Sequence, residues 1–87
     1  MPSKSFIIYK VTPKDMEKIG ETEKEVRTIK SGIVKDVKRD PIGYGIELLK
    51  VGVIVDEKVE GAMEKVTKEL ESLKSVEEVE QIGMTLL

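Results

Sequence analysis

The chain has 87 residues, a formal net charge of −2 with the two signs interleaved, and neither Cys nor His. This length suits a single domain over residues 1–87 with one modest core, and the composition excludes disulfides, the usual zinc sites, thiol nucleophiles and His-based acid–base relays, so no metal or cofactor is expected. No block of like charge or cluster of aromatics indicates direct nucleic-acid binding, and no apolar run reaches the length of a membrane span, so a cytoplasmic protein is expected.

The first part of the chain predicts a strand followed by a helix. Residues 5–11 are mostly β-branched and aromatic, as strand residues are. Thr12 and Pro13 are expected to begin the helix as its N-cap and first residue, because proline fits the first helical position. The helix is expected over residues 15–31, with Gly32 as its C-terminal stop.

A hairpin is predicted next. Residues 33–39 indicate a short strand, residues 40–45 a turn, and residues 46–56 the clearest strand in the chain. By the two-residue period of strands, one face of the third segment should carry Leu49, Val51, Val53 and Val55.

The last part predicts a second helix and a final strand. Asp56 is expected to cap a helix over residues 57–74, whose apolar positions share one face, and residues 76–87 hold the last strand. The order β-α-β-β-α-β forms two right-handed split βαβ units. The sequence therefore predicts an α+β, ferredoxin-like fold: a four-stranded antiparallel sheet with both helices on one face. This fold serves many functions and decides none by itself.

The run from Asp40 to Gly45 most favours a functional site. It reads Asp-Pro-Ile-Gly-Tyr-Gly, and a Pro and two Gly around one aromatic make a tight turn that directs Tyr44 outward. It is not a phosphate loop, because a third Gly is missing and a strand follows instead of a helix. An ordinary hairpin turn in which Tyr44 packs locally is the alternative interpretation, and both remain open at this point.

The sheet face away from the helices is a second candidate surface. It can serve a partner or weak self-association, or it can simply carry single exposed apolar residues, which are common. Its expected members are Leu48 and Ile54, with either Phe6 and Ile8 or Ile7 and Tyr9.

Three stretches carry a family resemblance. Residues 41–46 (Pro-Ile-Gly-Tyr-Gly-Ile), Leu49 and residues 53–59 (Val-Ile-Val-Asp-Glu-Lys-Val) closely resemble the C-terminal exchange domain of the translation elongation factor 1-beta family. That family shows a Pro-hydrophobic-Gly/Ala-aromatic-Gly turn, a long strand, and a Val-Val-acidic-acidic-Lys-Val helix start. The strand exit Val11–Pro13 is also similar, and the likeness spans essentially the whole chain. The absence of an N-terminal extension resembles the short archaeal form.

The resemblance implies a guanine nucleotide exchange factor with a ferredoxin-like fold. Its partner would be elongation factor 1-alpha, the GTPase that delivers aminoacyl-tRNA to the ribosome, with neither nucleic acid nor membrane as a direct partner. No enzyme chemistry is implied, because an exchange factor needs only to bind the nucleotide-free GTPase better than the GDP-bound one. In the family the turn aromatic packs onto the GTPase, and that position here is Tyr44. The residues expected to set its angle are Asp40, Pro41, Ile42, Gly43 and Gly45.

The C-terminal end departs from the eukaryotic members that it otherwise resembles. Those members place a Lys next to the C-terminus, where it reaches the Mg²⁺ and phosphate region, whereas this chain has Leu86 there, followed by Leu87. A leucine cannot compete electrostatically with Mg²⁺. Either exchange here relies on pushing structural elements apart, with Leu86 and Leu87 at the partner, or another cation substitutes. Lys38 and Arg39, beside the turn, are the nearest candidates in sequence.

Two other functions fit the sequence. One is a regulatory domain of this fold that binds a small molecule between sheets, although the missing metal ligands disfavour a metal-binding version. The other is a protein-interaction module without exchange activity.

Overall fold

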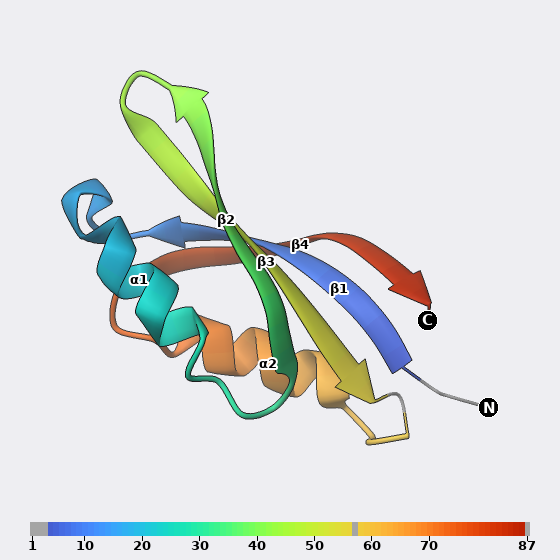
Figure 1. The fold of residues 1–87 in the computed structure, drawn as a ribbon. Helices are drawn as coiled ribbons and strands as arrows, with labels where there is room; N and C mark the ends of the chain where they lie inside the picture. The colour runs from blue at the N-terminus through green and yellow to red at the C-terminus, as the bar shows by residue number, and fades with distance from the viewer. Residues whose placement is uncertain (1–3, 57, 87) are drawn as a thin grey trace.

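The computed structural model describes residues 4–56 and 58–86, and Figure 1 shows how their elements are arranged. The order of elements and the ferredoxin-like fold are as predicted. Residues from both helices share one core with a single face of the sheet. In chain order the elements are β1 (Lys4–Pro13), the 3-10 turn η1 (Met16–Lys18), α1 (Ile19–Val26), β2 (Ile33–Gly43), β3 (Ile46–Asp56), α2 (Ala62–Glu71) and β4 (Val76–Leu86).

The four strands form one antiparallel sheet in the order β2-β3-β1-β4. The β1–β3 ladder ends where Val11 pairs with Leu49, but the β2–β3 ladder continues until Gly43 pairs with Ile46. The end of the β2–β3 hairpin is therefore a two-stranded arm that projects beyond the rest of the sheet (Figure 1).

The core lies between the sheet and the two helices. The face of β3 predicted from the two-residue period is the buried one, and Ile7, Tyr9 and Val11 are the residues of β1 that face the helices, which leaves Phe6 and Ile8 on the open face. The helices contribute Ile19, Val26, Ala62, Val66 and Leu70.

The predicted start of the first helix was wrong. Pro13 remains in β1, opposite Val76, and Asp15 caps the 3-10 turn η1 that precedes α1: its carboxylate accepts a hydrogen bond of 3.0 Å from the N–H of Glu17. Because Pro lacks a donor, it is tolerated at a strand end as readily as at a helix start. Sequence pattern alone does not separate these two places.

The first helix is also shorter than predicted. It ends at Val26, and the loop that follows is held by hydrogen bonds to α2. The carboxylate of Glu69 in α2 accepts hydrogen bonds from the N–H groups of Lys30 and Ser31 at 2.9–3.1 Å, and these groups can then no longer bond within a helix. Gly32 does not end the helix; it allows close packing, because a Cβ there would lie 2.6 Å from Cγ1 of Val53.

The hairpin strands are longer, and the turn shorter, than predicted. Asp40 pairs with Leu48, and Pro41 pairs with Glu47, so both belong to β2. Pro41 is compatible with this because β2 is an edge strand, and within sheets proline is found mainly on edge strands. The turn consists of Tyr44 and Gly45 alone.

The second helix starts later and ends earlier than predicted. Asp56 does not cap it; its carboxylate accepts a 2.9 Å hydrogen bond from the N–H of Lys58, within a turn. The helix begins after Gly61, which adopts a left-handed conformation (φ 72°), and ends at Glu71. Of the predicted apolar stripe, Val66 and Leu70 are fully buried, whereas Val59 precedes the helix and is exposed.

Candidate functional site

The turn between β2 and β3 has an unusual backbone. Gly43, Tyr44 and Gly45 have successive φ angles of 104°, 55° and 74°. Positive φ at both turn residues is the geometry of a tight hairpin whose twist matches its strands, and Gly or Asn normally fills such positions. Within residues 4–56 and 58–86, Tyr44 is the one non-glycine residue with positive φ.

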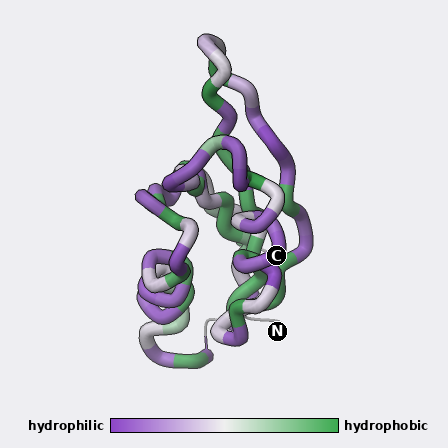
Figure 2. Tube along the Cα trace, turned by 90° about the vertical axis from the view of Figure 1, so that its left-hand side faces the viewer, coloured by the Kyte–Doolittle hydropathy of each residue, from purple (hydrophilic) through white to green (hydrophobic). Residues whose placement is uncertain are grey.

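Tyr44 is fully exposed (102%), so its ring makes no packing contact with the rest of the chain. Ile42 and Ile46 on either side are exposed as well. We call residues 41–46 the tip. In Figure 2 the tip lies at the top of the molecule, where a short hydrophobic stretch adjoins it. The prediction that Tyr44 points outward is confirmed, and local packing of its ring is ruled out.

The conformation of Tyr44 lowers the stability of the fold. A left-handed conformation costs roughly 1–2 kcal/mol for a residue with a Cβ, and a fully exposed ring recovers none of this through burial. Asn or Gly would form the same turn at lower cost. Folding alone therefore does not account for a tyrosine at this position.

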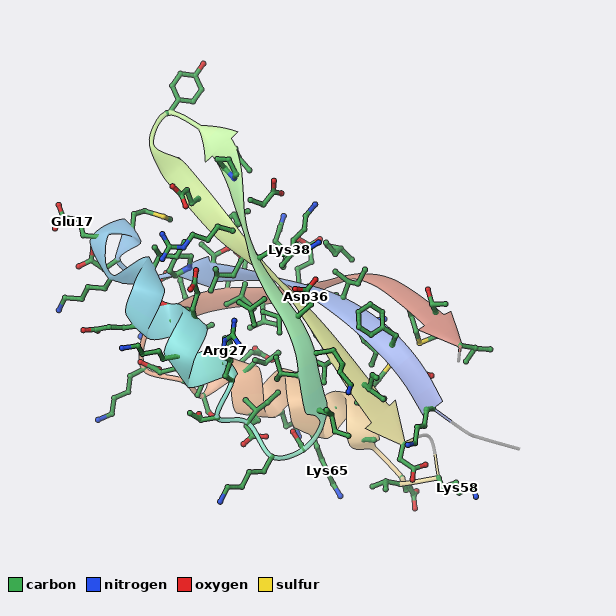
Figure 3. All side chains as sticks on the ribbon, viewed as in Figure 1. Glu17, Arg27, Asp36, Lys38, Lys58 and Lys65 are labelled. Carbon is green, nitrogen blue, oxygen red and sulfur yellow. The ribbon has the colours of Figure 1, made fainter. Side chains whose placement is uncertain are left out.

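A row of lysines crosses the open face of the sheet below the tip. Lys38 pairs with Lys50 across the β2–β3 ladder, and Lys50 pairs with Lys10 across the β3–β1 ladder. Like charges in this arrangement repel. Each lysine has an acidic neighbour, and the ammonium-to-carboxylate distances are 3.6 Å for Lys38–Asp36, 3.4 Å for Lys50–Asp40 and 3.0 Å for Lys10–Glu80. Figure 3 shows Lys38 and Asp36 close together on β2.

Arg39 lies on the opposite face of β2 and is directed toward α1. Its Nε donates a hydrogen bond to Oε1 of Glu23. The hydrogen bond with Glu23 and then the charge of Glu23 raise the pKa of the Arg39 guanidinium, and the carboxylate of Glu47 adds to this. Sequence reasoning missed Glu23, because nothing in the local pattern of a helix indicates which strand residue it will meet.

The structure does not bring Leu86 and the tip together. Leu86 is exposed (68%) on the edge strand β4, where it pairs with Ser5, and Ser5 pairs with Val55 of β3. Val55 is nine residues from Ile46, which corresponds to about 30 Å along the strand. Leu87, the other residue predicted at this end, lies outside the described residues.

The same register separates Lys38 from the C-terminal end. Lys38 is level with Glu80 of β4, six residues before Leu86, or roughly 20 Å along the strand direction. Arg39 is held by Glu23 on the other face. Neither residue is placed to act where a cation at position 86 would act.

The open face is only partly apolar. Phe6 and Ile8 are partly exposed there with Ile54, but Leu48, expected on this surface, is buried (7% exposed). A hollow of about 170 Å³ is lined by Phe6, Ile8, Asp36, Lys38, Lys50 and Gly52. Small-molecule sites usually enclose about 300–1,000 Å³, so this face offers little to the regulatory-domain alternative. Weak self-association through it stays a prediction.

Two further features are absent from the described part of the chain. No group of three or more acidic side chains there could hold a metal ion. None of its helices is long and apolar enough to cross a membrane.

Comparison with known proteins identifies the family. A sequence model described as the EF-1 guanine nucleotide exchange domain matches residues 6–87. The chain is 35% identical over 83 residues to elongation factor 1-beta of Methanospirillum hungatei JF-1, covering 93% of this chain and 94% of that protein. It is 32% identical over 82 residues to elongation factor 1-beta of Ignicoccus hospitalis, covering 88% and 85%.

A solved structure supports the fold independently. The C-terminal domain of the MgtC protein from Mycobacterium tuberculosis superposes with a TM-score of 0.56, covering 98% of this chain and 88% of that one. The sequence identity is 10%, so this likeness concerns the fold alone. With the family model matching nearly the whole length, this chain belongs to the EF-1 guanine nucleotide exchange domain family.

Proposed function

We propose that the tip is the part of this chain that contacts elongation factor 1-alpha. Membership of the family makes the chain a guanine nucleotide exchange factor for that GTPase. An exchange factor promotes the replacement of GDP bound to the GTPase by GTP. One observation supports the role of the tip above all others: Tyr44 is fully exposed in a disfavoured backbone conformation. A side chain that destabilises the fold and packs against nothing within it is best explained by a contact outside it.

Exchange of this kind needs no bond-making chemistry. A GTPase holds GDP through Mg²⁺ and through backbone N–H groups around the phosphates. A protein that binds the nucleotide-free form more tightly than the GDP-bound form weakens GDP binding, and GDP weakens binding of that protein by the same factor. A preformed tip suits this task because little conformational entropy is lost when it binds. A GTPase of translation as partner implies work in the cytoplasm.

The residues around Tyr44 would fix its direction. Gly43 and Gly45 allow positive φ angles on either side of Tyr44, and Pro41 restricts the strand that leads into the turn. Asp40 pairs with Lys50 across the hairpin at 3.4 Å, which ties the two strands together below the tip. Ile42 would add apolar contact area beside the aromatic ring.

The C-terminal half of β4 would form a second contact with the GTPase. Ile82, Met84 and Leu86 are exposed there, on an edge strand. At about 30 Å from the tip, Leu86 would reach a different part of the partner. The contact would be apolar and would push structural elements apart, since Lys38 and Arg39, the two cations beside the turn, both lie away from position 86. Leu87 is proposed to take part for the same reason.

Release of a fluorescent GDP analogue from elongation factor 1-alpha, followed by stopped flow, tests the tip. Tyr44→Ala should lower the exchange rate by about 30-fold, corresponding to roughly 2 kcal/mol for an aromatic anchor, with an unchanged melting curve. Tyr44→Phe should retain the rate. Ile33→Ala, at an exposed position at the opposite end of β2, is the matched control and should also retain it. A wild-type rate for Tyr44→Ala would refute the role of the tip.

A further inference from the structure

The arm that carries the tip lacks support from the rest of the sheet. Residues 46–48 of β3 lie beyond the last β1 partner and pair with β2 alone. A two-stranded ribbon by itself is marginally stable in water and twists more freely than a wider sheet. The direction of the arm, and with it the position of Tyr44, therefore depends on contacts made near the base of the arm.

One such contact joins the arm to the helical layer. Arg39 pairs with Leu49, the last residue of β3 that is also paired with β1, so it stands where the arm leaves the sheet. Its Nε donates a hydrogen bond to Glu23 of α1, and its guanidinium passes close to Gly20, where a Cβ would lie 3.7 Å from Nη2. Among residues 4–56 and 58–86, this is the one recorded side-chain hydrogen bond or ion pair between the β2–β3 hairpin and a helix.

We propose that Glu23 and Arg39 are a positioning pair: their bridge fixes the direction of the arm relative to α1 and thereby presents Tyr44 to the GTPase. The inference rests on the proposed function of the tip. It also gives Arg39 a task other than replacing the missing lysine, since its charge is engaged on the helix side of the sheet.

The energetics separate a positioning role from a merely structural one. The side chains of Arg39 and Glu23 are 47% and 26% exposed, and a partly exposed pair of this kind contributes little to global stability. Loss of the bridge should leave the melting temperature nearly unchanged. It should instead broaden the orientations of the arm, which reduces the fraction of molecules that are ready to bind.

The test uses Arg39→Met, which keeps the aliphatic stem, Glu23→Gln, and the charge-reversed double variant Glu23→Arg with Arg39→Glu. Amide order parameters and residual dipolar couplings of residues 40–47 report the arm in the free protein, and GDP release reports exchange. Each single variant should reorient or loosen the arm and slow exchange about fivefold, as expected if one molecule in five is correctly oriented. The double variant should restore both. Lys10→Met, which removes an ion pair on the open face away from the arm, is the matched control.

Three results would overturn the proposal. The first is an unchanged arm in Arg39→Met. The second is a changed arm with a wild-type exchange rate in a protein whose Tyr44→Ala variant is inactive. The third is an exchange defect that the double variant does not repair, since Arg39 would then act by touching the partner directly. Failure of the proposed function is seen separately, as retained exchange in Tyr44→Ala.

Discussion

The hydroxyl of Tyr9 and Oγ1 of Thr67 lie 3.2 Å apart where α2 packs on β1. The Tyr9 side chain has no exposed surface, and both hydroxyls also reach the main-chain carbonyl of Met63, Thr67 at 3.0 Å and Tyr9 at 3.4 Å. A buried hydroxyl without a partner is costly, so this shared arrangement lets an aromatic ring fill the core without that penalty. Burial raises the pKa of Tyr9 above its ordinary value, while the hydrogen bond with Thr67 acts in the opposite direction.

Tyr9→Phe should change how stability depends on alkaline pH. Because the pKa of Tyr9 is higher in the folded state, the unfolded chain loses this proton first as pH rises. The contribution of Tyr9 to the free energy of unfolding is therefore fully present below about pH 10 and is lost above it. Tyr9→Phe should cost about 1 kcal/mol at neutral pH, for the lost hydrogen bond, and should decline less steeply above pH 10. Denaturant titrations across this range measure both effects. Tyr44→Phe, which removes an exposed hydroxyl, should keep the wild-type slope; equal slopes for all three proteins would contradict the prediction.

Glu69→Gln should weaken the fold mainly at neutral pH. The Ser31 hydroxyl, 2.6 Å from Oε1, is the main cause that lowers the pKa of Glu69; desolvation opposes it, and the N–H groups of Ser31 and Lys30 add to the lowering. The stabilisation is therefore present above the ordinary glutamate pKa and is lost as pH falls below it. We expect a loss of about 1 kcal/mol at pH 7 that is smaller at pH 3, because the carboxylate becomes protonated as pH falls. Urea unfolding at the two pH values tests this, with Glu71→Gln on the same helix as the control. A difference that persists at low pH would show that the charge of Glu69 is not responsible.

The periodic parts of the fold were predictable from the sequence. Alternation along β3 identified its buried face, because a strand that is half-buried must place apolar residues on every second position. The Tyr44 turn was recognised for a similar local reason, since Gly on both sides of an aromatic permits positive φ angles that other residues avoid.

The parts that depend on contacts distant in sequence were not predictable. The first helix ends where Glu69, some 40 residues away, captures the N–H groups that would continue it. The pairing of Arg39 with Glu23 of α1 was not predicted, because the two residues are close only in the folded structure. Helix propensity and charge pattern do not indicate either of these contacts. The helix boundary and the ion pair are set by the tertiary structure, which the local sequence does not reveal.

Two glycine substitutions should have opposite effects. In Gly32→Ala, the new Cβ would lie 2.6 Å from Cγ1 of Val53 and 3.2 Å from the carbonyl oxygen of Ile54, so the core or the backbone must shift; we expect a loss of about 1–3 kcal/mol. In Gly20→Ala, within α1, the Cβ meets only an ordinary 3.7 Å contact with Arg39, and the more restricted unfolded chain should add about 0.5–1 kcal/mol. Thermal unfolding of both variants measures the difference. If Gly32→Ala had the wild-type melting temperature, the chain around Val53 would be able to shift and accommodate the new Cβ at little cost.

Tyr44→Asn tests whether the tyrosine contributes to the stability of the turn or to binding of the partner. Asn tolerates the left-handed conformation far better than a bulky aromatic, and Asn followed by Gly is a preferred pair for a turn of this shape. We therefore expect Tyr44→Asn to raise the free energy of unfolding by about 1 kcal/mol. The same variant should lose exchange as severely as Tyr44→Ala, because the ring is gone.

A gain in stability together with a loss of activity would show that the tyrosine is kept at the tip for what it binds, since it does not help the fold. Denaturant unfolding and stopped-flow GDP release on one preparation supply both values, and Gly45→Ala serves as the control in the other direction. That change keeps the ring but places a Cβ at φ 74°, so it should lower stability by roughly 1 kcal/mol while retaining part of the exchange rate. If Tyr44→Asn proved both less stable and fully active, the ring would have a role within the fold, and the partner contact would have to lie elsewhere.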